Sequence, residues 1–269
     1  MAVFDIATGA ALMDGLTAIA VRAAIAIVQS GPGAVRRKID GSPVTAADEA
    51  AEAVICEGLK DLAPSVPVIS EEQAQLGKAF ALGDHSGGYF LVDPLDGTRE
   101  FIAGRDEFTV NIALVNKGAP ILGIVVAPAL KLAWRGIVGR GADRLALAGK
   151  ASPVAIHTRP RPPKPVVMVS RSHLDPNTSA YLETLPPRVT EARGSSIKFC
   201  RIAEGTADLY PRLAPTHDWD VAAGHAIVTA AGGNVTDPGG SPVVYGSRDF
   251  LIPFFIATGD PSTSYAYER

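Results

Sequence analysis

The stretch YFLVDPLDGTREFI, residues 89–102, joins an apolar run to a turn that carries two aspartates. The run ends at Val92, and Pro94 fixes φ between Asp93 and Asp96. Gly97 then permits a sharp exit from the turn. Two carboxylates this close must share a proton or bind a cation, so the turn predicts a charged site at the end of a buried strand. Asp and Gly are also common turn residues, and the turn alone does not decide between a site and an ordinary loop.

Two other acidic clusters lie at the ends of predicted elements. VISEEQ, residues 68–73, ends a strand with Glu71 and Glu72, and HDWDVAAG, residues 217–224, places Asp218 and Asp220 at the start of a helix. If these clusters and the 93–96 turn converge, they form an all-oxygen site of the kind that binds Mg²⁺.

The residues that follow the turn suit a phosphate. Gly97 and Thr98 offer backbone N–H groups and a hydroxyl at the start of the next element. Divalent metals beside a phosphate indicate phosphoryl chemistry, in which two ions activate a water and stabilise the leaving oxygen. The sequence contains neither a P-loop nor a G-x-G-x-x-G motif, so those phosphate-binding designs are excluded.

The order of predicted elements changes near the middle of the chain. Two helices come first, one ending at Gly31 to Gly33 and one with Thr45 as its N-cap, and strands in an antiparallel meander follow. The segment 152–165, SPVAIHTRPRPPKP, indicates an extended connector, and helices and strands alternate beyond it. We therefore expect an α/β fold with an N-terminal α+β domain on an antiparallel sheet at 1–150 and a C-terminal α/β domain at 151–269.

Composition narrows the class of protein. The chain has 269 residues, is 47% hydrophobic and 20% charged, and carries a net charge of −3, which excludes a basic nucleic-acid binder. Cys56 and Cys200 fall in predicted helices, so we expect no disulfide framework and a reducing compartment. Asp5, Asp14 and Arg22 interrupt the apolar N-terminus, which argues against stable membrane insertion, although a peripheral contact stays open.

Three motifs of the chain resemble the signatures of the inositol monophosphatase superfamily of Mg²⁺-dependent, lithium-sensitive phosphatases. They are DPLDGT at 93–98, SEE at 70–72 and WDVAAGHAIVTAAGG at 219–233. Other stretches are most similar to the bacterial 3'(2'),5'-bisphosphate nucleotidases of the CysQ type, namely DGSPVTAAD at 40–48, EFTVNIALV at 107–115 and GSSIKFCRIAEGTADLYPRL at 194–213. The resemblance covers nearly the whole chain and implies a layered αβαβα fold of the sugar-phosphatase kind, with the site between the two halves.

The resemblance also implies a role for individual residues. Glu71, Asp93 and the main-chain carbonyl of Leu95 would bind a first Mg²⁺, and Asp93, Asp96 and Asp220 a second, with two or three ions in total. Asp48 and Thr98 would orient and deprotonate the attacking water, assisted by Glu71. Gly97 and Thr98 would hold the scissile phosphate beside the metal ligands Glu71, Leu95, Asp96 and Asp220. Ser195, Ser196 and Lys198 would take a second phosphate and a ribose.

Simpler interpretations exist for two of these residues. Asp48 also fits a helix first-turn acid, and Lys198 also fits a solvated helix lysine.

The activity that the resemblance implies is removal of the 3'-phosphate of adenosine 3',5'-bisphosphate, in sulfur assimilation. The alternatives are an inositol monophosphatase or other sugar-phosphate phosphatase, and a non-catalytic nucleotide-binding protein. The expected partner is a small molecule and not a nucleic acid. We expect a cytoplasmic monomer or homodimer, with a peripheral position at the inner face of the cell membrane left open.

Overall fold

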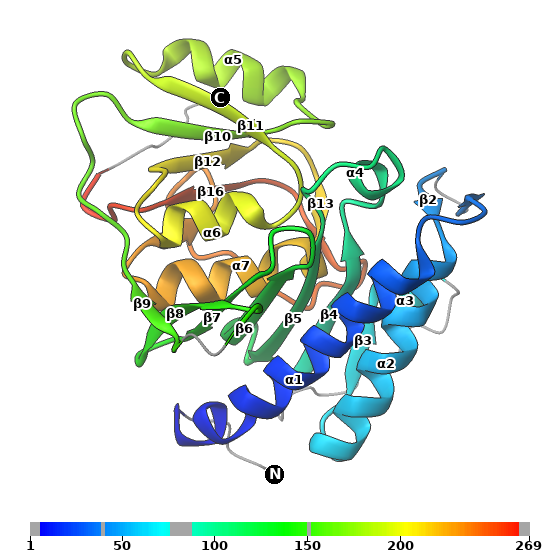
Figure 1. Cartoon of the computed structure of the whole chain (residues 1–269). Coiled ribbons are helices and arrows are strands. Elements are labelled where there is room, and N and C mark those ends of the chain that lie inside the picture. The colour runs from blue at the N-terminus through cyan, green and yellow to red at the C-terminus, as the bar shows by residue number, and fades with distance from the viewer. Residues whose placement is uncertain (1–5, 39–40, 76–87, 150–151, 264–269) are drawn as a thin grey trace.

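Layers of helices and sheets alternate through the molecule in the order α, β, α, β, α (Figure 1). The computed structural model describes residues 6–38, 41–75, 88–149 and 152–263. This architecture confirms the predicted layered α/β class.

The first sheet contains the predicted meander. Its strand order is β3-β4-β5-β6-β7-β8-β9, and every neighbouring pair is antiparallel except β3 and β4. The strands are β3 (Val68–Ser70), β4 (Tyr89–Asp96), β5 (Thr109–Asn116), β6 (Ala119–Ala127), β7 (Leu132–Ile137), β8 (Gly141–Ala146) and β9 (Val154–Ile156). Along β4, Tyr89 and Leu91 pack on one side of the sheet and Phe90 and Val92 on the other. Helices therefore cover both faces, which explains why the strands are nearly continuous apolar runs.

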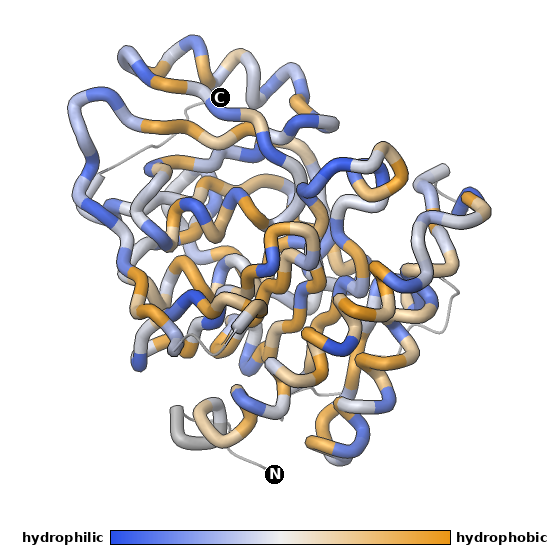
Figure 2. Tube along the Cα trace, in the orientation of Figure 1, coloured by the Kyte–Doolittle hydropathy of each residue, from blue (hydrophilic) through white to orange (hydrophobic). Residues whose placement is uncertain are grey.

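The outer face of this sheet is covered by α1 (Ile6–Ser30) and α2 (Ala46–Leu62). Both helices alternate between hydrophobic and hydrophilic residues along their length (Figure 2). Leu16, Ile19, Ala23 and Ile27, which follow one another at three- and four-residue spacing along α1, are buried, and the helix ends before Gly31 as expected. Among the described helices, α1 is the one long and apolar enough to cross a membrane. Its buried stripe makes it a core helix of this fold.

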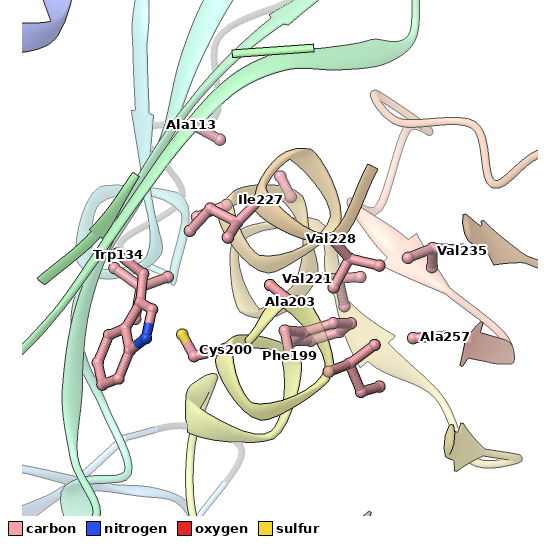
Figure 3. Close-up of a cluster of buried hydrophobic side chains, with 14 of the residues drawn as sticks. Ala113, Trp134, Phe199, Cys200, Ala203, Val221, Ile227, Val228, Val235 and Ala257 are labelled. Atoms are coloured by element: carbon pink, nitrogen blue, oxygen red, sulfur yellow. The ribbon is translucent and has the colours of Figure 1, made fainter. Parts of the chain in front are cut away.

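The second sheet and the remaining long helices come from the second half of the chain. Its strand order is β11-β10-β12-β16-β14, from β10 (Val166–Ser170), β11 (Val189–Arg193), β12 (Leu209–Arg212), β14 (Asn234–Thr236) and β16 (Phe255–Thr258). The helices α6 (Ile197–Ala203) and α7 (Asp218–Ala230) lie between the two sheets, and α5 (Pro176–Thr184) covers the far face of the second. In Figure 3, Phe199 and Ile227 from the middle layer fill the space between Trp134 of the first sheet and Ala257 of the second.

Several short elements were not predicted from the sequence. They are β1 (Arg36–Arg37), β2 (Pro43–Val44), α3 (Glu71–Gln75), α4 (Thr98–Ile102) and β13 (Thr216–His217), together with β8, β11 and β14. The segment 250–260, which the sequence predicts as one strand, contains two, β15 (Leu251–Ile252) and β16. The predicted connector at 152–165 contains β9, which pairs with β8 and extends the first sheet past residue 150. The division into domains at 150 stays a prediction.

Candidate active site

A cleft of about 250 Å³ opens where β4 ends, between the two halves of the chain. Predicted site residues from both halves line it: Glu71, Asp93, Leu95, Asp96, Gly97, Thr98, Ser195, Lys198 and Asp220. Asp48 and Ser196 do not line the cleft, but each is hydrogen-bonded to a residue that does. The fold therefore brings the dispersed acidic motifs to one place.

The turn after β4 is shaped by its own backbone. The pairing of β4 with β5 shifts register between Asp93 and Asp96, and the Leu95 N–H donates to Asp93 Oδ1 at 3.0 Å. Gly97 has φ +92°, and a Cβ there would lie 2.9 Å from the carbonyl oxygen of Glu107. Only glycine satisfies both conditions without displacing backbone. The glycine thus lets the turn approach the neighbouring loop closely.

The carboxylates of the cleft repel one another in the absence of a metal ion. Burial, followed by the charges of Glu71, Asp96 and Asp220, raises the pKa of Asp93 well above its usual range. Burial and the charge of Asp220 raise the pKa of Asp96 to about 6, against the opposite pull of Lys198. Burial, with contributions from Asp220 and Glu72, raises the pKa of Glu71 to about 8. Such a cluster gains stability from any cation that enters it.

Lys38 provides one such cation. Its Nζ donates to Glu71 Oε1 at 2.7 Å and to Glu72 Oε1 at 2.6 Å. Although burial alone would lower the pKa of Lys38, the two carboxylates raise it above its ordinary value. Sequence reasoning did not identify Lys38, because it lies 33 positions before Glu71 and no local pattern connects the two.

The other carboxylates are also held by protein donors. Asp220 accepts from the Thr216 hydroxyl and the His217 N–H, and Asp96 accepts from Ser196 Oγ at 3.0 Å. Within the described residues, no three acidic, histidine or cysteine side chains already form a closed cage for a metal ion. The arrangement is instead a set of acidic side chains held apart by these donors and by Lys38.

The residues nevertheless fit a hard divalent cation. Asp93 is 1% exposed and lies among the charges of Glu71, Asp96 and Asp220, all of them carboxylates that line the cleft. All-oxygen sets with several carboxylates are typical of Mg²⁺. Asp93, Asp96, Glu71 and Asp220 are the residues that would hold it.

Asp48 is fixed by the first turn of α2. Its Oδ2 accepts from the Thr45 N–H at 2.8 Å, and the Asp48 backbone N–H donates to the Thr45 side chain, so the two residues form a capping box. The Thr45 hydroxyl also donates to Asp48 Oδ2 at 2.7 Å. Its Oδ1 lies 3.1 Å from Thr98 Oγ1, which is also 3.1 Å from the Leu95 carbonyl oxygen. The helix cap and the predicted water-orienting pair therefore share one carboxylate.

The segment 194–198 has residues of two kinds. Ser196 Oγ lies 3.0 Å from both Asp96 Oδ2 and the Asp220 carbonyl. It therefore fixes residues of the acidic cluster without lining the cleft. Ser195 has φ +49°, lines the cleft, and its buried Oγ has no hydrogen-bond partner in the described structure. The buried Lys198 donates to the Ser195 carbonyl at 2.5 Å and lies over the Tyr210 ring.

Further residues of the cleft wall were not predicted. They are His173, Tyr210, Arg212 and Phe255, and Arg212 Nε is buried without a hydrogen-bond partner in the described residues. One sequence signal was available for Arg212. It is the last residue of β12, in the stretch ADLYPRL at 207–213, and charged residues at the end of an apolar run also mark the acidic cluster.

Comparison with known proteins agrees with this geometry. The profile of the inositol monophosphatase family matches residues 5–258. The chain belongs to this family. It is 46% identical over 252 residues to the 3'(2'),5'-bisphosphate nucleotidase CysQ of Salmonella typhimurium, covering 92% of this chain and 99% of that protein. It is 45% identical to the CysQ of Escherichia coli K12 over 249 residues, covering 91% and 98%.

A solved structure shares the fold at significant identity. The crystal structure of CysQ from Bacteroides thetaiotaomicron, described as a bacterial member of the inositol monophosphatase family, has a TM-score of 0.76 and 33% identity. The match covers 91% of this chain and 96% of that one. Enzymes of this family depend on metal ions, typically Mg²⁺, and act on small-molecule phosphates.

Proposed function

We propose that this protein is a Mg²⁺-dependent 3'(2'),5'-bisphosphate nucleotidase that hydrolyses the 3'-phosphate of adenosine 3',5'-bisphosphate to AMP and phosphate. One observation carries the proposal beyond general phosphatase chemistry. The acidic cluster and the Gly97–Thr98 turn line the same cleft as Ser195, Lys198 and Arg212. A substrate with two phosphates matches a site that combines a metal-binding cluster with cationic side chains.

The side chains of the first half account for the reaction at the phosphorus. When bound, two or three Mg²⁺ ions would neutralise the phosphate oxygens and lower the pKa of the attacking water. Asp48 and the Thr98 hydroxyl would orient that water and receive its proton. The water oxygen would form a new bond to phosphorus while the bond between phosphorus and the 3'-oxygen breaks, and the 3'-oxygen would leave as the alcohol with a proton taken from solvent water. The Gly97 and Thr98 N–H groups would hold the phosphate during this displacement.

The residues of the second half would hold the rest of the nucleotide. The Ser195 hydroxyl and the Arg212 guanidinium each have a buried polar atom that lacks a partner among the described residues, and both line the cleft. A second phosphate would satisfy both groups. Lys198 would act less directly, because its ammonium already donates to the Ser195 carbonyl.

This assignment fits a cytoplasmic enzyme of sulfur assimilation with no nucleic-acid partner. The net charge of −3 offers no basis for binding a polyanion. Because α1 contributes to the core of the first sheet, a contact with the inner face of the membrane would be peripheral. The expected assembly is a monomer or a homodimer.

A phosphate-release panel with Mg²⁺ tests the proposal. It compares adenosine 3',5'-bisphosphate, its sulfated analogue, inositol 1-phosphate and fructose 1,6-bisphosphate. We expect the highest kcat/KM for one of the two nucleotides, and inhibition by LiCl but not by equal NaCl. A preference for inositol 1-phosphate would replace the nucleotidase assignment by the sugar-phosphate alternative. No release from any of the four would favour a binding protein.

A further inference from the structure

Glu107 lies just outside the cleft and accepts hydrogen bonds from three residues of the other half of the chain. It belongs to the loop between α4 and β5, in the EFTVNIALV motif, to which the proposed chemistry gives no role. Its side chain is 13% exposed. Arg171 donates to both of its oxygens, from Nε at 2.7 Å and from Nη2 at 2.8 Å. Arg193 Nη1 and the Gly194 N–H also donate to it, at 3.3 and 2.9 Å.

These bonds connect segments that line the cleft. Arg171 does not line the cleft itself, but it lies between Ser170 and His173, which do. Gly194 and the residue that follows it, Ser195, also line the cleft. The Arg171 guanidinium also donates to the Ala192 carbonyl at 2.8 Å, so the loop after β10 and the end of β11 are joined at the same point.

The backbone of the same residue supports the phosphate turn. The Glu107 carbonyl oxygen would lie 2.9 Å from a Cβ at Gly97 and 2.7 Å from one at Gly194. Both glycines are thus packed directly against residue 107. The phosphate turn and the Ser195 segment are fixed relative to each other through this one residue.

An exposed ion pair alone would contribute little, typically below about 1 kcal/mol. Glu107 differs because its carboxylate is mostly buried, receives a bidentate arginine and also accepts a main-chain N–H next to Ser195, which has φ +49°. Charge-assisted, bidentate contacts are the stronger class of hydrogen bond and fix geometry. Their loss would release the Ser195 segment while the acidic cluster keeps its own contacts.

We propose that Glu107 is a positioning residue that joins the two halves across the cleft rim and sets the distance between the scissile-phosphate turn and the segment that takes the second phosphate. The role of Glu107 in selecting substrates with two phosphates rests on the proposed function. In this role Glu107 does not touch the reacting atoms. It favours substrates with two anionic groups by keeping Ser195 in place.

The test uses the full-length Mg²⁺-loaded enzyme with Glu107→Gln, and Arg171→Met as a second variant at the exposed partner. Asp143→Asn is the matched control, since Asp143 accepts a bidentate pair from Arg135 at 2.8 and 2.9 Å and neither residue lines the cleft. For both test variants we expect KM for adenosine 3',5'-bisphosphate to rise about tenfold with kcat within about threefold, and kinetics on inositol 1-phosphate to change less than about twofold. The control should match wild type.

Amide hydrogen exchange supplies a readout that is independent of activity. Exchange in peptides covering 170–173 and 193–196 should accelerate in both test variants and not in Asp143→Asn. Unchanged exchange would overturn the proposed connection. Equal losses on both substrates, or a lower KM for the bisphosphate because the freed arginines bind it, would overturn the specificity role. If wild-type enzyme does not prefer the bisphosphate, the proposed function fails and the specificity role with it, whereas the connection is still judged by exchange.

Discussion

At the scale of single residues, the cleft is a set of buried carboxylates whose charges are only partly compensated. Lys38 contacts Glu71 and Glu72 directly, and Lys198 acts on Asp96 through space. Asp93 has no cation in hydrogen-bond contact among the described residues. The metal-free protein should therefore be less stable with these groups ionised than with them protonated.

This imbalance predicts how stability depends on pH. The pKa values of Asp96 and Glu71 are raised in the folded state, to about 6 and about 8. A raised carboxyl pKa means that the folded state binds the proton more tightly, so this stabilisation is present at low pH and is lost as pH rises through 6 to 8. Without metal, the free energy of unfolding in urea should fall between pH 5 and pH 8.5. Saturating Mg²⁺ should remove the decrease, and the same slope with and without Mg²⁺ would contradict the assignment.

Removing one carboxylate should separate stability from activity. Asp96→Asn deletes a predicted metal ligand and one like charge, so we expect kcat to fall at least about 100-fold while the melting temperature of the metal-free protein stays equal or rises. Enzyme assays at saturating Mg²⁺ and thermal unfolding in EDTA measure the two effects. Near-normal kcat in the variant would rule out Asp96 as a ligand.

The acidic residues could be predicted from the sequence because they lie near the end of a strand or in the first turn of a helix, next to an apolar run, as Asp96 and Asp220 do. Lys38 could not be placed in the same way. Its partners Glu71 and Glu72 are distant in sequence, and no local pattern connects it to them. The inward orientation of Ser196 was equally unpredictable, since adjacent serines of one turn differ only in which side of the segment they face.

At the scale of elements, the first turn of α2 does two things at once. Thr45 caps the helix, and the same bonds hold Asp48 toward Thr98. The cap was predictable because Thr followed by an acid three residues later is a local signal. The long helices and the meander were predictable for similar local reasons, whereas two-residue strands such as β13 and β15 form only because the chain brings their segments together.

Because Thr45 both caps α2 and orients Asp48, we expect a substitution of this capping residue to lower activity as well as stability. Thr45→Val should destabilise the protein by about 1 kcal/mol, and kcat should also fall about tenfold because Asp48 loses a donor that orients it. Asp175→Ala is the matched control, as Asp175 caps α5 through the Thr178 N–H at 2.8 Å on the outer layer. The Asp175→Ala variant should lose about as much stability as Thr45→Val, and its kcat should stay unchanged. If both variants lose stability and neither loses kcat, the cap serves the helix alone.

At the scale of the whole molecule, α7 connects the two sheets and carries Asp220 in its first turn. It packs unusually close to the first sheet. A Cβ at Gly123 of β6 would lie 2.3 Å from the Ala223 carbonyl oxygen, and one at Gly136 of β7 would lie 2.7 Å from Ile227 Cα. These glycines therefore set the distance between α7 and the first sheet. That distance in turn sets the position of Asp220 relative to Asp93.

The distance between α7 and the first sheet can be changed by a substitution outside the cleft. Gly123→Ala places a methyl group against helix backbone, and overpacking of this kind destabilises by about 1–3 kcal/mol. Because the helix must move outward, Asp220 should withdraw from the acidic cluster, and the Mg²⁺ concentration for half-maximal activity should rise about tenfold. Gly9→Ala on the opposite face is the control, since its Cβ would make only a 3.4 Å contact with Ile137. Isothermal titration with Mg²⁺ reports affinity apart from turnover. A variant that loses stability but binds Mg²⁺ as wild type would show that Asp220 is positioned by its own cap, through Thr216 and His217, and not by the distance between α7 and the first sheet.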